Sequence, residues 1–286
     1  MIEQFAKHIT VEDIICLTGL ILLACWLLKT SLGRNALVDS APRRNNMPVY
    51  LPFIPLFIWF GSVPLTTSIA RQITTDLPDW QNALWDNLIL CIGAILTIVL
   101  IIFLARASFA RRLKGFGLNV KTIHKDFLFA FINLLSIWPL VLAAAVITIF
   151  IGKFIWGQDF YLEQHEELKT ITEYSQLPLR ILIIIVTVVV APVLEEMLFR
   201  GLFQTMIRSF FEFRFSNLES RNGVWLAILI SSGLFVMVHA NAGHWPALFM
   251  LALCLGYSYE KSGSLFRPIF IHSFFNSVAI IAVLSQ

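Results

Sequence analysis

Charge is scarce in this chain, because only 14% of its 286 residues are Asp, Glu, Lys or Arg, whereas 58% are hydrophobic. A soluble domain carries about 25% charged residues and arranges its apolar residues in stripes, not in long runs. The composition therefore excludes a soluble globular protein and indicates a polytopic membrane protein. The four cysteines lie inside apolar runs and form no C-x-x-C pair, so they predict neither a disulfide framework nor a metal site.

Several larger patterns are also absent. The chain has no internal repeat, no low-complexity tract and no linker long enough to separate a second domain. We therefore expect one integrated membrane domain, with N-terminal helices and an interfacial segment in residues 1–175 and a catalytic helix bundle in residues 176–286. The lack of inverted repeats argues against a carrier, and the lack of an H-E-x-x-H sequence removes the usual zinc protease signature.

Long apolar stretches are abundant. A helix that crosses a bilayer needs about 20 mostly apolar residues, and we predict an all-α, polytopic bundle of about eight such spans with the active site inside it. The predicted spans are Ile14–Leu28, Tyr50–Ala70, Leu84–Ala105, Phe127–Ile151, Leu179–Arg200, Val224–His239, Trp245–Tyr257 and Leu265–Leu284.

Charges alternate in sign between successive loops. The basic loops hold Lys29, Arg34, Arg43, Arg44, Arg106, Arg111, Arg112, Lys114, Lys121, Lys125, Arg208, Arg214 and Arg221. The opposite loops hold Asp76, Asp79, Asp159, Glu163, Glu166, Glu167 and Glu173. Because basic loops stay in the cytoplasm, both chain termini are predicted to lie outside. The segment from Phe154 to Tyr174 mixes aromatic and acidic residues, and we expect a short interfacial helix or a lid there.

The fifth predicted span carries charges at its end, namely Glu195, Glu196 and Arg200. A charge at membrane depth costs at least ~2.5 kcal/mol, so such residues are usually functional. Glu196 and Arg200 are four residues apart, which places them on one helix face where they can form an ion pair. We expect the chemistry of this protein to take place around Glu195.

Two later spans each add a polar pair at helical spacing, Phe235 with His239 and His272 with Asn276. Polar groups on three helices are expected to converge inside a bundle. A carboxylate in a low-dielectric site can act as a general base on water, and a histidine can pass a proton to a leaving amine. A second histidine with an asparagine can donate hydrogen bonds to an oxyanion. This set suits hydrolysis of an amide bond.

Simpler interpretations of the same residues remain open. The charges around Glu195 can mark a solvated cytoplasmic helix end, His239 can cap a helix at the interface, and His272 can join two helices by a hydrogen bond. The predicted spans also place Glu195 shallow and His239 deep. The two can meet only if the fifth span continues past Arg200 toward Arg208, or if the sixth begins later than Val224.

The three motifs, EExxxR at 195–200, FxxxH at 235–239 and HxxxN at 272–276, resemble those of the CPBP family of intramembrane proteases. This family is related to the type II CAAX prenyl endopeptidases and to bacteriocin-processing and self-immunity (Abi) proteins. The stretch LGYSYEKSGSLFRPIFIHSFFNS, residues 255–277, is similar to the bacterial branch. The resemblance covers about residues 180–277, and the first four spans show no motif of the family.

The resemblance implies a glutamate-dependent endopeptidase without a cofactor, in the bacterial cytoplasmic membrane. Glu195 and His239 would activate water, and His272 and Asn276 would stabilise the oxyanion. The full expected set is Glu195, Glu196, His239, His272 and Asn276, supported by Arg200 and Phe235.

Its substrate would be a membrane-associated or lipidated peptide or protein at a cytoplasm-facing site, with no nucleic-acid partner. One alternative is a zinc protease that uses Glu195, His239 and His272 as ligands. Another is a non-catalytic immunity or scaffold protein, or a proton relay.

Overall fold

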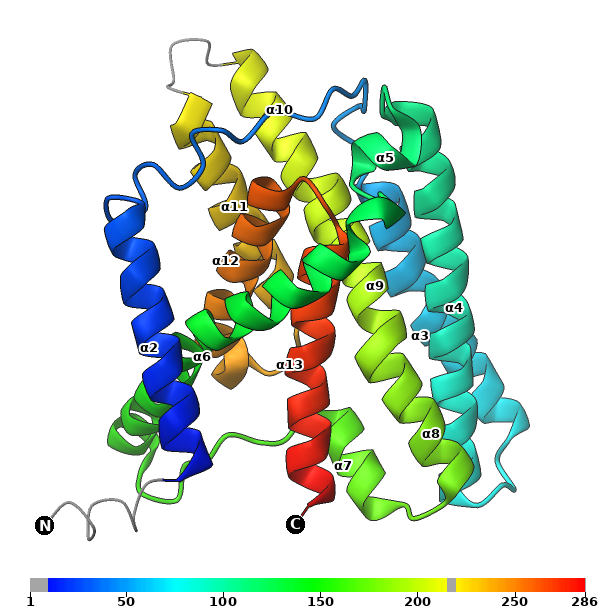
Figure 1. Ribbon diagram of the computed structural model, residues 1–286. Helices are drawn as coiled ribbons and strands as arrows, with labels where there is room; N and C mark the ends of the chain where they lie inside the picture. The colour runs from blue at the N-terminus through cyan, green and yellow to red at the C-terminus, as the bar shows by residue number, and fades with distance from the viewer. Residues whose placement is uncertain (1–9, 215–219, 286) are drawn as a thin grey trace, which may run out of the picture.

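The computed structural model of the protein describes residues 10–214 and 220–285 and is a bundle of helices (Figure 1). Within these ranges no residue lies in a β-strand, and the one isolated β-bridge joins Asn45 and Phe109. The helices are α2 (Val11–Lys29), α3 (Phe53–Ile73), α4 (Asp79–Ser108), α5 (Arg112–Phe116), α6 (Ile123–Trp156), α7 (Glu166–Glu173), α8 (Leu177–Ile185), α9 (Ala191–Glu196), α10 (Thr205–Arg214), α11 (Ser220–Met237), α12 (Trp245–Ser262) and α13 (Phe266–Leu284).

All eight predicted spans are helical, but fewer than eight have the length and apolarity to cross a membrane. Among the described helices six qualify, namely Val11–Lys29, Phe53–Ile73, Asp79–Ser108, Val120–Trp156, Leu177–Arg214 and Phe266–Leu284. The apolar part of α11 is shorter, at Asn222–Met237. The last turns of α12 read YSYEKS, which lowers its apolarity. The predicted count of eight spans is therefore not confirmed, whereas the all-α polytopic bundle is.

The largest difference from the predicted boundaries lies in the fifth span. It was expected at Leu179–Arg200, and the structure extends it to one continuous helical stretch of 38 residues, Leu177–Arg214. Glu195 therefore lies near the middle of this helix and not shallow at its end. The extension past Arg200 is one of the two predicted conditions under which Glu195 and His239 can meet.

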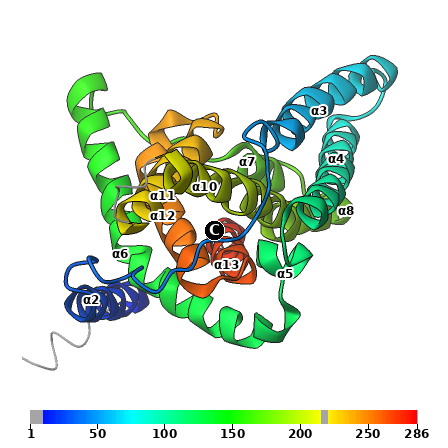
Figure 2. The same ribbon diagram turned by 90° about the horizontal axis from the view of Figure 1, so that it is seen from above.

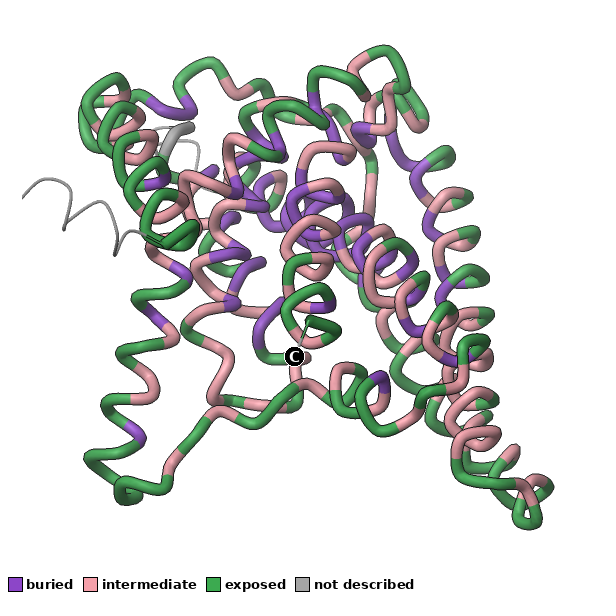
Figure 3. The backbone as a smooth tube through the Cα atoms, turned by 60° about the horizontal axis from the view of Figure 1, so that its bottom comes forward, coloured by how far each residue is buried: buried purple, intermediate pink, exposed green. Residues whose placement is uncertain are grey.

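The helices at the edge of the bundle present apolar side chains outward. Leu17 on α2 is 61% exposed, Phe57 on α3 69%, Phe103 on α4 63% and Phe150 on α6 72%. Figure 2 shows α2 and α3 at opposite edges of the molecule, and Figure 3 shows that buried residues concentrate in its centre. This pattern is expected where lipid chains replace water around the bundle.

A glycine allows α2 to pack closely on α6, which runs obliquely across the bundle in Figure 1. A Cβ atom at Gly19 would lie 2.3 Å from the carbonyl oxygen of Leu135 and 2.8 Å from the ring of Pro139. Small residues permit such close approach of membrane helices. The indole of Trp26 donates a hydrogen bond to the hydroxyl of Tyr257 at 2.8 Å, which also joins α2 to α12.

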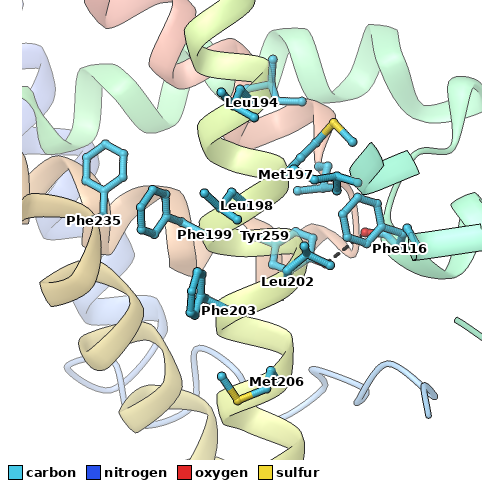
Figure 4. Packing of buried hydrophobic residues seen from close by; sticks show 14 of the residues in the cluster. Phe116, Leu194, Met197, Leu198, Phe199, Leu202, Phe203, Met206, Phe235 and Tyr259 are labelled. Carbon is cyan, nitrogen blue, oxygen red and sulfur yellow. Dashed lines mark hydrogen bonds between the residues drawn. The ribbon is translucent and has the colours of Figure 1, made fainter. Parts of the chain in front are cut away.

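The apolar core surrounds the middle of the long helix. Figure 4 shows Leu194, Leu198, Phe199, Leu202, Phe203 and Phe235 packed together, with Phe116 and Tyr259 beside them. A Cβ atom at Gly201 would lie 2.3 Å from the Phe116 ring, so a glycine is needed for this contact. The core therefore fixes the position of the helix that carries Glu195 and Glu196.

Candidate active site

A wide helical turn precedes the two glutamates. Pro192 has no backbone N–H, and the turn before it, Val186–Val190, is π-helical, with the amide of Ala191 donating to the carbonyl of Val186. A π-helical turn is a rare distortion that occurs frequently at functional sites. Pro192 has no N–H to donate, and the amide of Ala191 donates to Val186. The carbonyl oxygen of Thr187 instead accepts a hydrogen bond from Nδ2 of Asn276 on α13 at 2.8 Å. The predicted HxxxN residue thus anchors α13 to the glutamate helix.

Glu196 is buried and forms charge-assisted hydrogen bonds with two side chains. Its Oε1 lies 3.1 Å from Nη1 of Arg200 and 2.9 Å from Nδ1 of His272. The side chains of Glu196 and Arg200 have no exposed surface, and Nη2 of Arg200 donates to the carbonyl of Ala252 at 3.2 Å. The ion pair predicted from the four-residue spacing is therefore present and joins α9, α12 and α13.

His272 connects the two glutamates. Its Nδ1 faces the carboxylate of Glu196, which can only accept hydrogen bonds. Nδ1 therefore carries the hydrogen, and Nε2 is the hydrogen-bond acceptor in the neutral ring. Nε2 lies 3.9 Å from Oε2 of Glu195, an oxygen that has no hydrogen-bond partner within the described chain. Glu195 therefore places a buried, unpaired carboxylate oxygen beside an oriented imidazole, while its side chain as a whole is partly exposed.

His239 reaches the site from a turn and not from a helix. The predicted span ended at His239, but α11 ends at Met237. Nδ1 of His239 lies 2.8 Å from the carbonyl oxygen of Phe235, so Nδ1 carries the hydrogen and Nε2 remains the acceptor. The indole of Trp245 donates to the carbonyl of His239 at 2.9 Å and fixes the turn.

Phe235 supports three of the polar side chains by packing. The Arg200 guanidinium carbon lies 4.4 Å from the centre of its ring. The imidazoles of His239 and His272 lie 4.7 Å and 5.7 Å away, centre to centre. Phe235 is fully buried, so the FxxxH motif places an aromatic wall behind the site and a histidine in it.

One cavity of about 1290 Å³ receives four of the five predicted catalytic side chains, those of Glu195, His239, His272 and Asn276. Glu196 does not line it. The rest of the lining includes aromatic and apolar residues, Trp59, Phe60, Leu90, Trp156, Phe160 and Tyr161, and acidic residues, Asp159, Glu163, Glu166 and Glu167.

The predicted interfacial segment borders this cavity. It consists of the linker, residues 157–165, followed by α7. Nε2 of His244 lies 2.7 Å from the carbonyl oxygen of Glu163, and the ring of His165 stacks on that of His244 at 4.4 Å. Burial and the neighbouring His244 lower the pKa of His165, with Glu167 opposing the shift. The linker thus lines the cavity and contacts His244 through Glu163 and His165.

The predicted ligands of the alternative zinc site are Glu195, His239 and His272. Nδ1 of His272 is bonded to Glu196, which leaves Nε2 as the ring nitrogen that faces Glu195. Among residues 10–214 and 220–285, no group of three or more His, Cys, Asp or Glu side chains is placed to hold a metal ion.

A polar column that the sequence analysis did not identify continues from the site. It comprises Glu196, Arg200, Gln204 and Arg208, each four residues after the last. Nε2 of Gln204 donates to Oε1 of Glu260 at 2.9 Å, and Arg208 and Arg43 both pair with Oε2 of Glu260. The repeated four-residue spacing beyond EExxxR was the signal that could have revealed this column.

The comparisons with known proteins agree with the resemblance drawn from the motifs. Residues 177–278 match the family model "Type II CAAX prenyl endopeptidase Rce1-like". The chain is 28% identical over 134 residues to an "Uncharacterized 24.3 kDa protein" of Escherichia coli. It is 30% identical over 100 residues to a protein of Bacillus subtilis named "Putative membrane peptidase YdiL".

These matches cover part of each protein. The aligned regions span 46% of this chain and 58% of the Escherichia coli protein, and 35% of this chain and 36% of the Bacillus subtilis protein. No solved structure matches the chain. The predicted resemblance to the type II CAAX prenyl endopeptidases is confirmed for residues 177–278. This region contains Glu195, His239, His272 and Asn276.

Proposed function

We propose that this protein is an intramembrane endopeptidase of the Rce1-like type, in which Glu195 and His239 activate water while His272 and Asn276 stabilise the oxyanion. The observation that carries the proposal is the shared cavity, which four polar side chains from three parts of the chain line together. The family match over residues 177–278 supports the reaction class. The substrate is a peptide segment associated with the membrane.

The proposed reaction begins with a water molecule between Glu195 and His239. Glu195 or the Nε2 of His239 accepts a proton while the water oxygen attacks the peptide carbonyl. Preorganised donors then stabilise the tetrahedral oxyanion, a role we assign to Asn276 and to His272, whose Nε2 becomes a donor when Glu195 passes to it the proton taken from water. The accepted proton passes to the leaving amine as the C–N bond breaks, which restores the starting protonation states.

Glu196 has a different role from Glu195 in this proposal. It is fully buried, and it orients His272 through Nδ1 while Arg200 balances its charge. We assign Glu196 and Arg200 as positioning residues, in place of the catalytic role that the motif alone suggested for Glu196. A carboxylate that accepts a hydrogen bond from one imidazole nitrogen fixes the tautomer and the orientation of the ring.

The test is a comparison of new peptide termini in bacterial membranes that carry wild-type protein, Glu195→Gln or Glu173→Gln. Glu173 is exposed on α7 outside the cavity, so Glu173→Gln is the matched control. We expect termini that appear with the wild type and Glu173→Gln and disappear with Glu195→Gln. Termini that persist with Glu195→Gln would remove Glu195 from the reaction.

The zinc alternative and the non-catalytic alternative give different results in the same assay. A zinc protease would lose cleavage after chelation and regain it when zinc is added, whereas we expect cleavage to be unchanged. An immunity or scaffold protein would keep its biological effect in Glu195→Gln and yield no new termini.

A further inference from the structure

The cavity extends further from Glu195 in one direction than in the other. On the long helix its lining residues run from Val186 to Phe199 and stop there. On α13, which runs the opposite way in Figure 1, they begin at His272 and continue to Ala279. Both helices therefore line the cavity toward the end of the bundle where α8 begins and α13 ends, which is also where the linker and α7 lie.

The opposite end of the site is closed by packed side chains. Arg200 and Gln204 are fully buried, Arg208 is 3% exposed and Glu260 is 4% exposed. The side chains of Arg43 and Arg208 pair with Glu260, and Tyr259 and Phe116 fill the space beside them without exposed surface. Among the described residues, a path to Glu195 along this part of the long helix would have to break the buried ion pairs.

The two ends of the bundle differ in charge. The closed end carries the basic loops, which include the segment from Lys29 to Arg44 and the segment from Arg106 to Lys125. The open end carries the linker and α7, where Asp159, Glu163, Glu166, Glu167 and Glu173 outnumber Lys169. Basic loops of membrane proteins remain in the cytoplasm, so the closed end is cytoplasmic and the open end faces outward.

From these three observations we infer that the cavity opens to the extracytoplasmic side and takes its substrate from there. The inference rests on the proposed peptidase function and narrows its substrate class. The substrate is a polypeptide segment displayed at the outer face of the membrane, which enters past the linker. A lipidated chain end on the cytoplasmic side, expected from the sequence, would meet the closed end.

Thiol labelling measures the opening without depending on cleavage. In a chain whose four cysteines are replaced by serine, single cysteines are introduced by Gln164→Cys in the linker, Ala279→Cys in the cavity wall, or Arg111→Cys in a basic loop. None of the three belongs to the proposed catalytic or positioning set. The probe is a charged maleimide that does not cross membranes, applied to right-side-out and to inverted vesicles.

We expect Gln164→Cys and Ala279→Cys to react in right-side-out vesicles and Arg111→Cys to react only in inverted ones. Reaction of Gln164→Cys or Ala279→Cys only in inverted vesicles would overturn the inference. Absence of reaction at Ala279→Cys from both sides would also overturn it, because the cavity would then be closed to water.

A cleavage assay separates this inference from the proposed function. A randomised peptide segment is fused next to a single membrane anchor, either on the outer or on the cytoplasmic side, and expressed with wild-type protein or Glu195→Gln. We expect cleavage of the outer fusion by the wild type alone. Cleavage of only the cytoplasmic fusion would overturn the inference but keep the peptidase, whereas cleavage of neither fusion would contradict the peptidase itself, whatever the labelling shows.

Discussion

Glu195 and Glu196 are adjacent in the sequence but have different environments. The side chain of Glu196 is fully buried and bonded to Arg200 and His272, whereas that of Glu195 is 26% exposed and lines the cavity. A carboxylate that must meet water and substrate requires an open oxygen, and a carboxylate that orients a histidine requires a fixed one. The doublet therefore supplies both environments within one helical turn.

Asn276 has an anchoring hydrogen bond to Thr187 and also lines the cavity. If the Asn276 amide donates a hydrogen bond to the oxyanion, the Asn276→Ala substitution will lower kcat by about 10²–10³-fold and leave KM nearly unchanged. The control is Ser277→Ala, because the Ser277 hydroxyl donates a hydrogen bond to the carbonyl of Ser273 in its own helix. A rise in KM with normal kcat would instead identify Asn276 as a substrate contact.

Arg200 is predicted to act on stability. Arg200→Ala leaves Glu196 charged, buried and without its cation, which typically costs about 3–5 kcal/mol. We expect a lower thermal midpoint and a lower yield of folded protein, partly recovered when Glu196→Gln is added. The control is Arg71→Ala, since the Arg71 side chain in the Arg71–Asp86 pair is 57% exposed and such pairs contribute about 0–1 kcal/mol. Normal stability of Arg200→Ala would show that the ion pair is dispensable.

At the scale of elements, the contact of Phe116 with the long helix determines where Glu195 and Glu196 lie. Gly201→Ala would force a methyl group into the Phe116 ring, and overpacking of this kind costs about 1–3 kcal/mol. We expect a lower thermal midpoint that Phe116→Leu restores. Gly233→Ala is the control, because no atom lies within 4 Å of its added Cβ. Equal midpoints for the two alanine variants would contradict this packing.

The linker is predicted to respond to pH through His165. The pKa of His165 is lowered from its ordinary value of 6.5, chiefly by burial and then by His244. His165 therefore binds a proton less readily when the linker lies against the cavity than when the linker is displaced. The closed position of the linker is thus stable above pH 6.5 and becomes less stable as the pH falls below 6.5.

Hydrogen–deuterium exchange over residues 157–165 measures this response, after correction for the intrinsic effect of pH on exchange. Uptake should rise at acid pH in the wild type, and the rise should be absent in His165→Gln. The α3–α4 turn, residues 74–78, is the internal control. An equal rise in the wild type and His165→Gln would rule out His165 as the sensor.

Local patterns in the sequence predicted much of the site. Hydropathy located all eight helical segments, and the four-residue spacing predicted the Glu196–Arg200 pair. Helix ends were predicted less well, because Gln204 and Arg208 look like the polar end of a span until their partner Glu260 is known. That partner lies 52 residues beyond Arg208, and such a contact depends on tertiary packing.

At the scale of the whole molecule, the site is closed toward the basic loops and open toward the acidic ones. Loop charge was enough to predict an orientation, but the side on which the cavity opens depends on how the long helix and α13 pack. Helices whose outer faces are apolar hold this arrangement in the bilayer, and the buried column from Glu196 to Arg208 separates the site from the basic end.

The most direct measurement is peptide cleavage by the purified protein reconstituted in lipid vesicles, using a segment identified from the new membrane termini. The rate is compared for the wild type, Glu195→Gln and Glu173→Gln. We predict that Glu195→Gln lowers kcat by at least about 10²-fold while the protein stays folded, and that Glu173→Gln cleaves at the wild-type rate. Cleavage by folded Glu195→Gln at the wild-type rate would contradict a peptidase centred on Glu195.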